Sequence, residues 1–234
     1  MVNNWFDIIQ YSLLPPSCIL CGNEGMTDID LCQPCYEALI PNGSHCHCCA
    51  KQFENENLNL LLCGDCQKKP RAFDRTYAPY IHQGSMRHLI NHCKFNGKYK
   101  YTRLLGLLLA NHLHAHAEAL PELIIPVPLH PKRYRQRGFN QSMEIGKIIA
   151  NELSIPIDAR CCQRIKDTPH QVSLTAKQRH KNIQNAFQII TKPVAKHIAI
   201  LDDVMTTGAT SNELAKVFKA VGVKRVDIWV CTRA

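Results

Sequence analysis

The sequence predicts an α/β fold with a parallel sheet, preceded by a small metal-binding module in the N-terminal third of the 234 residues. Apolar stretches such as residues 123–129 and 197–201 are typical of strands that are buried on both faces of a parallel sheet. Helical patterns alternate with these stretches, and four Cys-x-x-Cys pairs lie before them. We expect the module to cover residues 1–70 and the α/β domain to cover residues 71–234.

The cysteine pairs predict structural zinc. Each pair presents two thiolates to one ion, and two pairs complete a closed tetrahedral site. Sequential pairing is the simplest arrangement, and interleaved pairing stays open. His45, His47 and Cys48 surround the third pair and leave ligand identity there less certain. A redox Cys-x-x-Cys is the alternative, although such a motif usually stands alone. The expected zinc ligands are Cys18, Cys21, Cys32, Cys35, Cys46, Cys49, Cys63 and Cys66.

The cysteine count and the length of the apolar runs indicate the cellular compartment and part of the core. Thirteen cysteines without a recognisable secretion signal favour metal ligands over disulfides, and we expect a cytoplasmic protein. No apolar run reaches the length of a membrane span, so we expect no membrane insertion. The cysteines outside the pairs, Cys93, Cys161, Cys162 and Cys231, are expected in the core.

Charge is distributed unevenly between the two parts of the chain. The net charge is +9, but residues 1–70 carry 3 Lys/Arg against 8 Asp/Glu, a balance of −5. The rest carries 25 against 11, a balance of +14. A basic α/β domain fits a polyphosphate ligand and also nucleic acid, and charge alone does not separate them.

The predicted elements of the α/β domain follow in order. Hydrophobic periodicity favours strands at residues 77–81, 123–129, 159–162, 197–201 and 225–231, and helices at 86–93, 101–120, 143–149 and 214–221. His112 and His116 share the i, i+4 spacing of a metal pair, but no Glu follows His112 as a zinc-protease motif requires. We interpret them as surface or half-buried histidines. A polar segment of about twenty residues after Arg164 predicts a functional loop.

The candidate site follows the strand at residues 197–201. Two acids, Asp202 and Asp203, come before a loop rich in hydroxyls and glycine that opens a helix. Backbone N–H groups at the start of a helix bind phosphate, and adjacent acids accept hydrogen bonds from ribose hydroxyls or hold Mg²⁺. The segment after residue 129 is expected as a basic loop facing the same pocket, where its cations would bind pyrophosphate. The candidate residues for binding pyrophosphate, and also for binding DNA, are Lys132, Arg133, Arg135 and Arg137.

The string Ile-Leu-Asp-Asp-Val-Met-Thr-Thr-Gly-Ala-Thr at residues 200–210 resembles the phosphoribosyl pyrophosphate (PRPP) loop of type I phosphoribosyltransferases. With Pro-Val-Pro-Leu-His at 126–130, Arg-Gly-Phe-Asn-Gln at 137–141 and the Cys-x-x-Cys module, the chain is similar to the ComF/GntX (ComFC-like) family. This resemblance implies a type I phosphoribosyltransferase-like sheet and PRPP binding with Mg²⁺. The residues that it implies for PRPP are Asp202, Asp203, Met205, Thr206, Thr207, Gly208, Ala209, Thr210, Leu129 and His130.

The polar segment after Arg164 resembles the flexible loop that closes over PRPP in this superfamily. Closure would exclude water while an oxocarbenium-like ribosyl centre forms. The resemblance therefore implies catalytic roles for Arg164 and Arg179 beside Asp202 and Asp203.

Two functional hypotheses follow. In the first, the chain is an enzyme in which an unidentified nucleophile displaces pyrophosphate from PRPP, as in nucleotide metabolism. In the second, it is a PRPP-sensing zinc protein that binds single-stranded DNA. The resemblance implies a role in natural transformation, with DNA-uptake or helicase proteins as partners. The sequence contains no stretch that would recognise a nucleobase.

Overall fold

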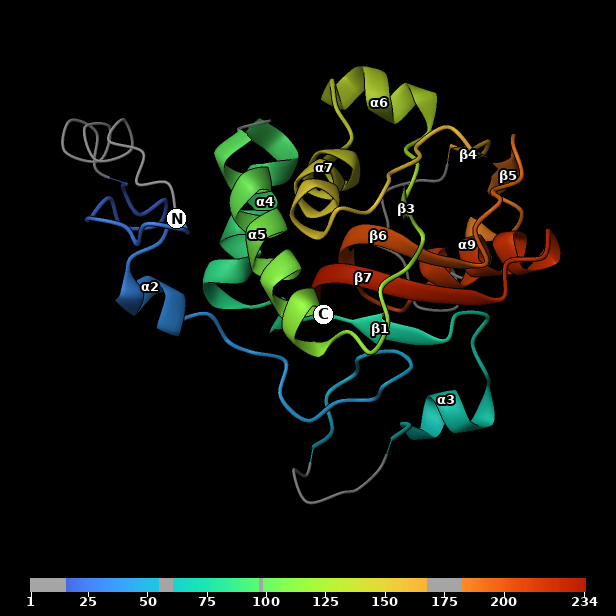
Figure 1. Ribbon diagram of the computed structural model, residues 1–234, viewed down its shortest axis with the longest axis horizontal. Helices are drawn as coiled ribbons and strands as arrows, with labels where there is room; N and C mark the ends of the chain where they lie inside the picture. The colour runs from blue at the N-terminus through green and yellow to red at the C-terminus, as the bar shows by residue number, and fades with distance from the viewer. Residues whose placement is uncertain (1–15, 55–60, 97–98, 168–181) are drawn as a thin grey trace.

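The computed structural model describes residues 16–54, 61–96, 99–167 and 182–234. At its centre lies a parallel sheet in the order β1-β7-β6-β3, with β2 also paired to β7 (Figure 1). The strands are β1 (Arg75–Tyr77), β2 (Tyr80–Ile81), β3 (Leu123–Pro126), β6 (His197–Met205) and β7 (Arg225–Arg233). The predicted α/β class with a parallel sheet is confirmed.

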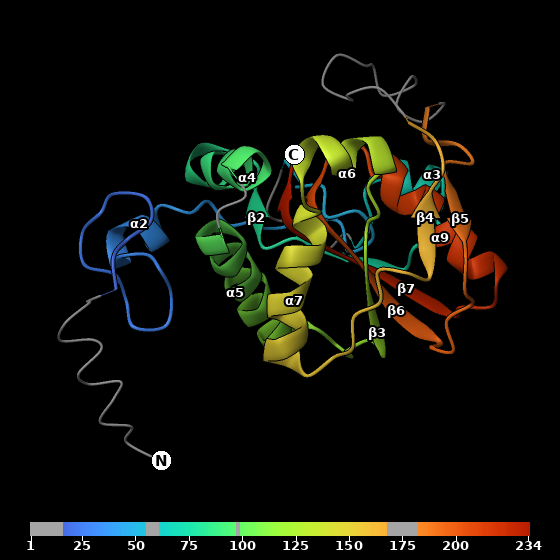
Figure 2. The same cartoon turned by 90° about the horizontal axis from the view of Figure 1, so that it is seen from above.

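Helices cover both faces of this sheet (Figure 2). One face carries α4 (Gly84–Asn96), α5 (Tyr99–His116) and α7 (Gln141–Leu153), and the other carries α9 (Ala209–Ala220). Within β6, Ala199 and Leu201 pack with the first group, whereas Ile198 and Ile200 pack with α9. Because every strand residue here is buried on one face or the other, the sequence is continuously apolar rather than alternating.

Helices α5 and α7 approach each other closely at a glycine. A Cβ added at Gly106 would lie 2.6 Å from the Ile148 Cβ atom, so a larger residue would force the two helices apart. The first turn of α7 reaches the carboxyl half of β6, where the Ser142 hydroxyl donates to Asp202.

The two cysteine-rich segments lie on opposite sides of the sheet, the first in the core of α4 and α5 and the second in the core of α9. The first is seen beyond α4 and α5 in Figure 1. The first contains α2 (Gln33–Glu37) and rests on α4 and α5, where Arg103 donates to Asp30 at 2.6 Å. The second contains α3 (Gly64–Lys68) and shares a core with α9. Arg233 of β7 donates to the Cys49 carbonyl at 2.9 Å, which ties the second segment to the end of the sheet.

Several predicted boundaries are wrong. Residues 77–81 form two strands interrupted at Ala78 and Pro79, and the helix predicted at 101–120 is α5, which ends at His116. The strand predicted at 159–162 is β4 (Cys162–Arg164), which pairs with β5 (Phe187–Ile189) as an antiparallel hairpin outside the main sheet.

The remaining predictions concern the cysteines outside the pairs, membrane spans and the domain boundary. Cys93, Cys161, Cys162 and Cys231 are buried, as predicted. No helix in the parts of the chain that the structure describes is long and apolar enough to cross a lipid bilayer. The domain boundary near residue 70 stays a prediction.

Candidate functional site

A pocket of about 460 Å³ lies at the carboxyl end of β6, between this strand, the start of α9 and the first turn of α7. We refer to it as the β6–α9 pocket. Asp202, Asp203 and residues 204–211 line one side of it. Strand β6 continues to Met205, which pairs with Arg233, so the prediction that the strand ends at the acids is wrong. The two carboxylates therefore stand on a hydrogen-bonded strand, which fixes their positions.

Hydrogen bonds orient both acids. The Asp202 Oδ1 atom accepts from the Ser142 hydroxyl at 3.1 Å and from the backbone N–H of Asp203 at 2.9 Å. The Asp203 Oδ1 atom accepts from the backbone N–H of Val204 at 2.9 Å, and Asp203 is only 4% exposed. These hydrogen bonds fix the orientation of both carboxylates at the pocket.

The loop after β6 brings backbone N–H groups to the pocket. Gly208 is the N-cap of α9 and has a φ of 72°, a left-handed conformation that favours glycine. The Thr207 hydroxyl accepts from the backbone N–H of Ala209 at 3.3 Å. Helix α9 has 12 residues, so its amino end carries the full positive end of a helix dipole. This arrangement suits an anion such as phosphate.

The basic segment after β3 is a helix, and the prediction of a loop is wrong. Helix α6 (Pro131–Arg137) begins with Pro131 at its first position, and the His130 ring accepts from the backbone N–H of Lys132 at 3.3 Å. It ends at Gly138, which is left-handed. Pro131 and Gly138 are typical of the first position and of the end of a helix. The Arg, Lys and Gln residues between them are good helix formers, so the segment folds as a helix.

Helical spacing divides the cations of α6 between two surfaces. Arg133 and Arg137, one turn apart, line the β6–α9 pocket, and burial lowers the pKa of Arg133. Lys132 and Arg135 are exposed and are not among the lining residues. Lys132 pairs with Asp167 at 3.2 Å.

Arg164 reaches the same pocket from the β4–β5 hairpin. It is 6% exposed, and its guanidinium lies 5.7 Å from the centre of the Phe187 ring. Burial, followed by the neighbouring charge of Arg133, lowers the pKa of Arg164 to about 10, so it remains a cation at neutral pH. Arg179 and most of the predicted closing loop lie outside the described residues.

The pocket also contains residues that the sequence analysis did not single out. His82, just before α4, and Asn91, within α4, line it, together with Gln141 and Ser142 of α7. Leu129 lines it as well, whereas His130 faces Asp167 at 3.8 Å and is not a lining residue. Gln141 belongs to the string that carries the family resemblance, which was the available signal. No local pattern marks His82 or Asn91.

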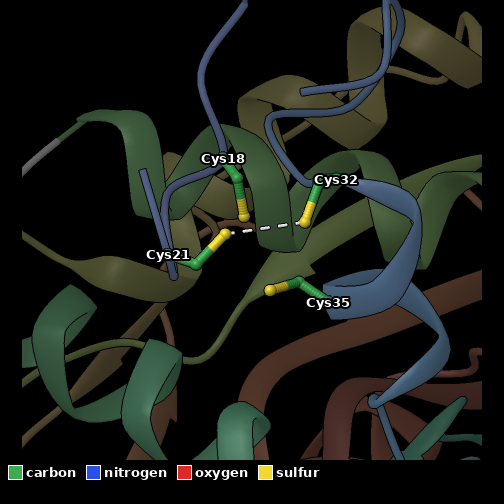
Figure 3. Close-up of side chains that lie close together, drawn as sticks. All are labelled: Cys18, Cys21, Cys32 and Cys35. Atoms are coloured by element: carbon green, nitrogen blue, oxygen red, sulfur yellow. Dashed lines mark hydrogen bonds between the residues drawn. The ribbon is translucent and has the colours of Figure 1, made fainter. Parts of the chain in front are cut away.

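Two clusters of four cysteines fit structural zinc. The Sγ atoms lie within 4.8 Å of one another in each cluster, and the sequential pairing is confirmed. In the first cluster the Sγ atoms of Cys18 and Cys21 meet those of Cys32 and Cys35 at the start of α2, and the Cys21 and Cys32 Sγ atoms lie 3.6 Å apart (Figure 3). In the second, a hydrogen bond from the Cys49 thiol lowers the pKa of Cys46, which favours a thiolate ligand. The clusters comprise Cys18, Cys21, Cys32 and Cys35, and Cys46, Cys49, Cys63 and Cys66.

Residues 9–67 match a family model described as a double zinc ribbon domain. The chain is 32% identical to Competence protein F of Haemophilus influenzae, with 93% of this chain and 96% of that protein covered. It is 31% identical to the DNA utilization protein YhgH of Escherichia coli K12, with 92% and 89% covered. Competence protein ComFC of Streptococcus pneumoniae is 24% identical, with 92% and 99% covered.

Among solved structures, the glutamine PRPP amidotransferase of B. subtilis overlaps 55% of this chain and 25% of its own chain. The identity is 14% and the TM-score is 0.37, so this likeness carries no argument about the site. The sheet order and the two cysteine clusters described above carry the assignment of the fold.

Proposed function

We propose that this chain, which belongs to the ComF/GntX family of competence-associated, phosphoribosyltransferase-like proteins, binds PRPP in the β6–α9 pocket and acts in the handling of incoming DNA. Its relatives are named for competence and for DNA utilization.

The observation that carries the proposal is the combination of charged groups that line the pocket. Two carboxylates, the residues at the amino end of α9 and three arginines all line this one pocket. PRPP carries a ribose diol between a 5′-phosphate and a pyrophosphate. Asp202 and Asp203 would accept from the ribose hydroxyls, and residues 206–210 would donate to the 5′-phosphate. Arg133, Arg137 and Arg164 would bind the pyrophosphate.

The acid pair also fits Mg²⁺, which prefers carboxylate oxygens together with the oxygens of a bound phosphate. Such an ion would neutralise part of the charge on the pyrophosphate. If turnover occurs, the buried Arg164 would stabilise the charge that develops on the departing pyrophosphate, and an unidentified acceptor would take the ribosyl group. A sensor that only binds PRPP would use the same contacts.

A second observation favours contact with single-stranded DNA through α6. Its solvent face carries Lys132, Tyr134 and Arg135, of which Tyr134 is 51% exposed. A basic surface with an exposed aromatic ring binds single strands by phosphate contacts and base stacking. Because this face lies outside the lining of the β6–α9 pocket, DNA and PRPP would bind through different residues of one helix.

Competition between ligands tests the proposed ligand. Ribose 5-phosphate and pyrophosphate should each displace labelled PRPP, because each satisfies one half of the site. Arg164→Met should weaken the binding of pyrophosphate more than the binding of ribose 5-phosphate. If pyrophosphate does not compete at all, the arginine side of the proposal is wrong.

Salt-dependent binding of a labelled single-stranded oligonucleotide tests the DNA surface. Replacement of Tyr134 and Arg135 by alanine should weaken binding and reduce its salt dependence, whereas Asp203→Asn should leave both unchanged. The opposite pattern would mean that DNA occupies the β6–α9 pocket.

A further inference from the structure

A second cavity, of about 450 Å³, lies between the second cysteine-rich segment, which we call the second zinc ribbon, and the end of α5. Four histidines line it, and we refer to it as the histidine cavity. His45 and His47 flank the zinc ligand Cys46, and His112 and His116 belong to the last two turns of α5. Figure 1 shows the end of α5 next to β1.

The histidine cavity is separate from the β6–α9 pocket. Its floor includes Arg75 of β1, which pairs in register with Asp227 near the start of β7. The β6–α9 pocket lies at the other end of these strands, where Met205 pairs with Arg233. A ligand of the histidine cavity would therefore not touch PRPP.

Backbone carbonyls orient two of the rings. The His45 Nδ1 atom lies 3.0 Å from the Asn42 carbonyl oxygen, and the His116 Nδ1 atom lies 2.9 Å from the His112 carbonyl oxygen. A carbonyl only accepts, so the proton must be on Nδ1 in both rings. In the neutral form of each ring the lone pair is then on Nε2, which is the atom that would bind a metal ion.

The rings of His112 and His116 stack with their centres 4.4 Å apart, as residues at i and i+4 of a helix can. Burial, followed by the charges of His116 and His45, lowers the pKa of His112 to about 4. His112 is therefore neutral at physiological pH. The positive charge of Arg75 is paired with Glu118. His112 thus offers a neutral nitrogen acceptor, and the pairing of Arg75 with Glu118 makes the cavity less suited to an anion.

We propose that His45, His112 and His116 form a third metal site, which binds a divalent transition ion such as Zn²⁺ or Ni²⁺ between the second zinc ribbon and α5. Imidazole nitrogen suits these ions. Within the described parts of the chain, only the two cysteine clusters have three or more ligand atoms within 4.8 Å of one another. The ligand nitrogens must therefore be brought together by side-chain rotation, in which the exposed His116 ring would give up its hydrogen bond to the His112 carbonyl.

Metal content is the direct test. The full chain, with both cysteine sites loaded, is dialysed against micromolar Zn²⁺, and zinc per protein is measured by mass spectrometry. The proposal predicts three equivalents for the wild type and two for the variant carrying His112→Ala and His116→Ala. Retention of the two cysteine-bound equivalents shows that the variant is folded.

Helix α4 supplies a matched control. His88 and His92 have the same spacing, their ring centres lie 4.0 Å apart, and the His92 Nδ1 atom lies 3.0 Å from the His88 carbonyl oxygen. Neither of them lines the histidine cavity. Their double alanine variant should keep all three equivalents, and His45→Ala should lose the third. Two equivalents in the wild type, or a third that survives His45→Ala, would overturn the proposal.

Discussion

The variant Gly208→Ala tests how the amino end of α9 contributes to stability and to ligand binding. An L-residue at the φ of 72° costs about 1–2 kcal/mol. The new Cβ would also lie 2.6 Å from the Met205 Cε atom, which is the flexible end of its side chain and can move. The backbone strain therefore dominates, and the melting temperature should fall by roughly 2–8 °C for a chain of this size.

PRPP affinity should fall as well, because relief of the strain would turn the backbone N–H groups of the loop away from the 5′-phosphate. Loss of one charge-assisted hydrogen bond costs about 1.5–3 kcal/mol, which corresponds to a decrease in affinity of roughly 10-fold or more. Gly222→Ala is the matched control. Gly222 follows the other end of α9, has a φ of 99°, and a Cβ there would meet only the Lys192 Nζ atom at 3.7 Å.

Thermal denaturation gives the stability of both variants, and PRPP titration well below both midpoints gives their affinities. We expect similar losses of stability and a loss of affinity in Gly208→Ala alone. Wild-type affinity in both variants would refute the placement of the 5′-phosphate at the amino end of α9.

Three further predictions follow from burial and charge. Arg164→Met should weaken pyrophosphate competition by roughly 10–100-fold, because a charged donor contributes about 1.5–3 kcal/mol, and Arg164→Lys should restore part of it. Burial raises the pKa of Cys162 to about 12, whereas an unfolded thiol ionises near pH 8.5, at about its reference pKa. Unfolding releases this proton, so stability should fall as pH rises from about 8.5 towards 12, and urea denaturation of Cys162→Ala should show a smaller fall. Cys66→Ser should weaken PRPP binding more than Cys35→Ser when zinc content and affinity are measured together, because the ribbon of Cys66 shares a core with Met205 and Ala209.

The sequence predicts the fold well wherever burial imposes a pattern. Strand β6 is apolar at Ile198, Ala199, Ile200 and Leu201 because the sheet buries both of its faces. The spacing of the cysteine pairs predicts the two clusters because two neighbouring Cys-x-x-Cys turns complete one tetrahedral site.

Helix α6 shows where the prediction failed. Its charged residues suggest a solvated loop, but His130 at the N-cap, Pro131 at the first position and the left-handed Gly138 define a helix. These signals were present in the sequence and were outweighed by the charge. The helical spacing then decides which arginines reach the β6–α9 pocket.

Contacts between distant segments could not be predicted from one sequence. His82 reaches the pocket because its backbone N–H donates to the Arg233 carbonyl of β7 at 2.8 Å, and no local pattern in the sequence records that contact or the position of Asn91. The placement of the two zinc ribbons on opposite faces of the sheet depends on tertiary contacts in the same way, as does the meeting of His45 with the end of α5.

The central claim is that the β6–α9 pocket binds PRPP through its acid pair. Calorimetric titration of PRPP into the zinc-loaded chain, with and without Mg²⁺, tests it most directly when repeated with Asp203→Ala. The account predicts binding by the wild type that Mg²⁺ strengthens and that Asp203→Ala abolishes. Absence of binding by the folded wild type, or equal binding by both proteins, would contradict it.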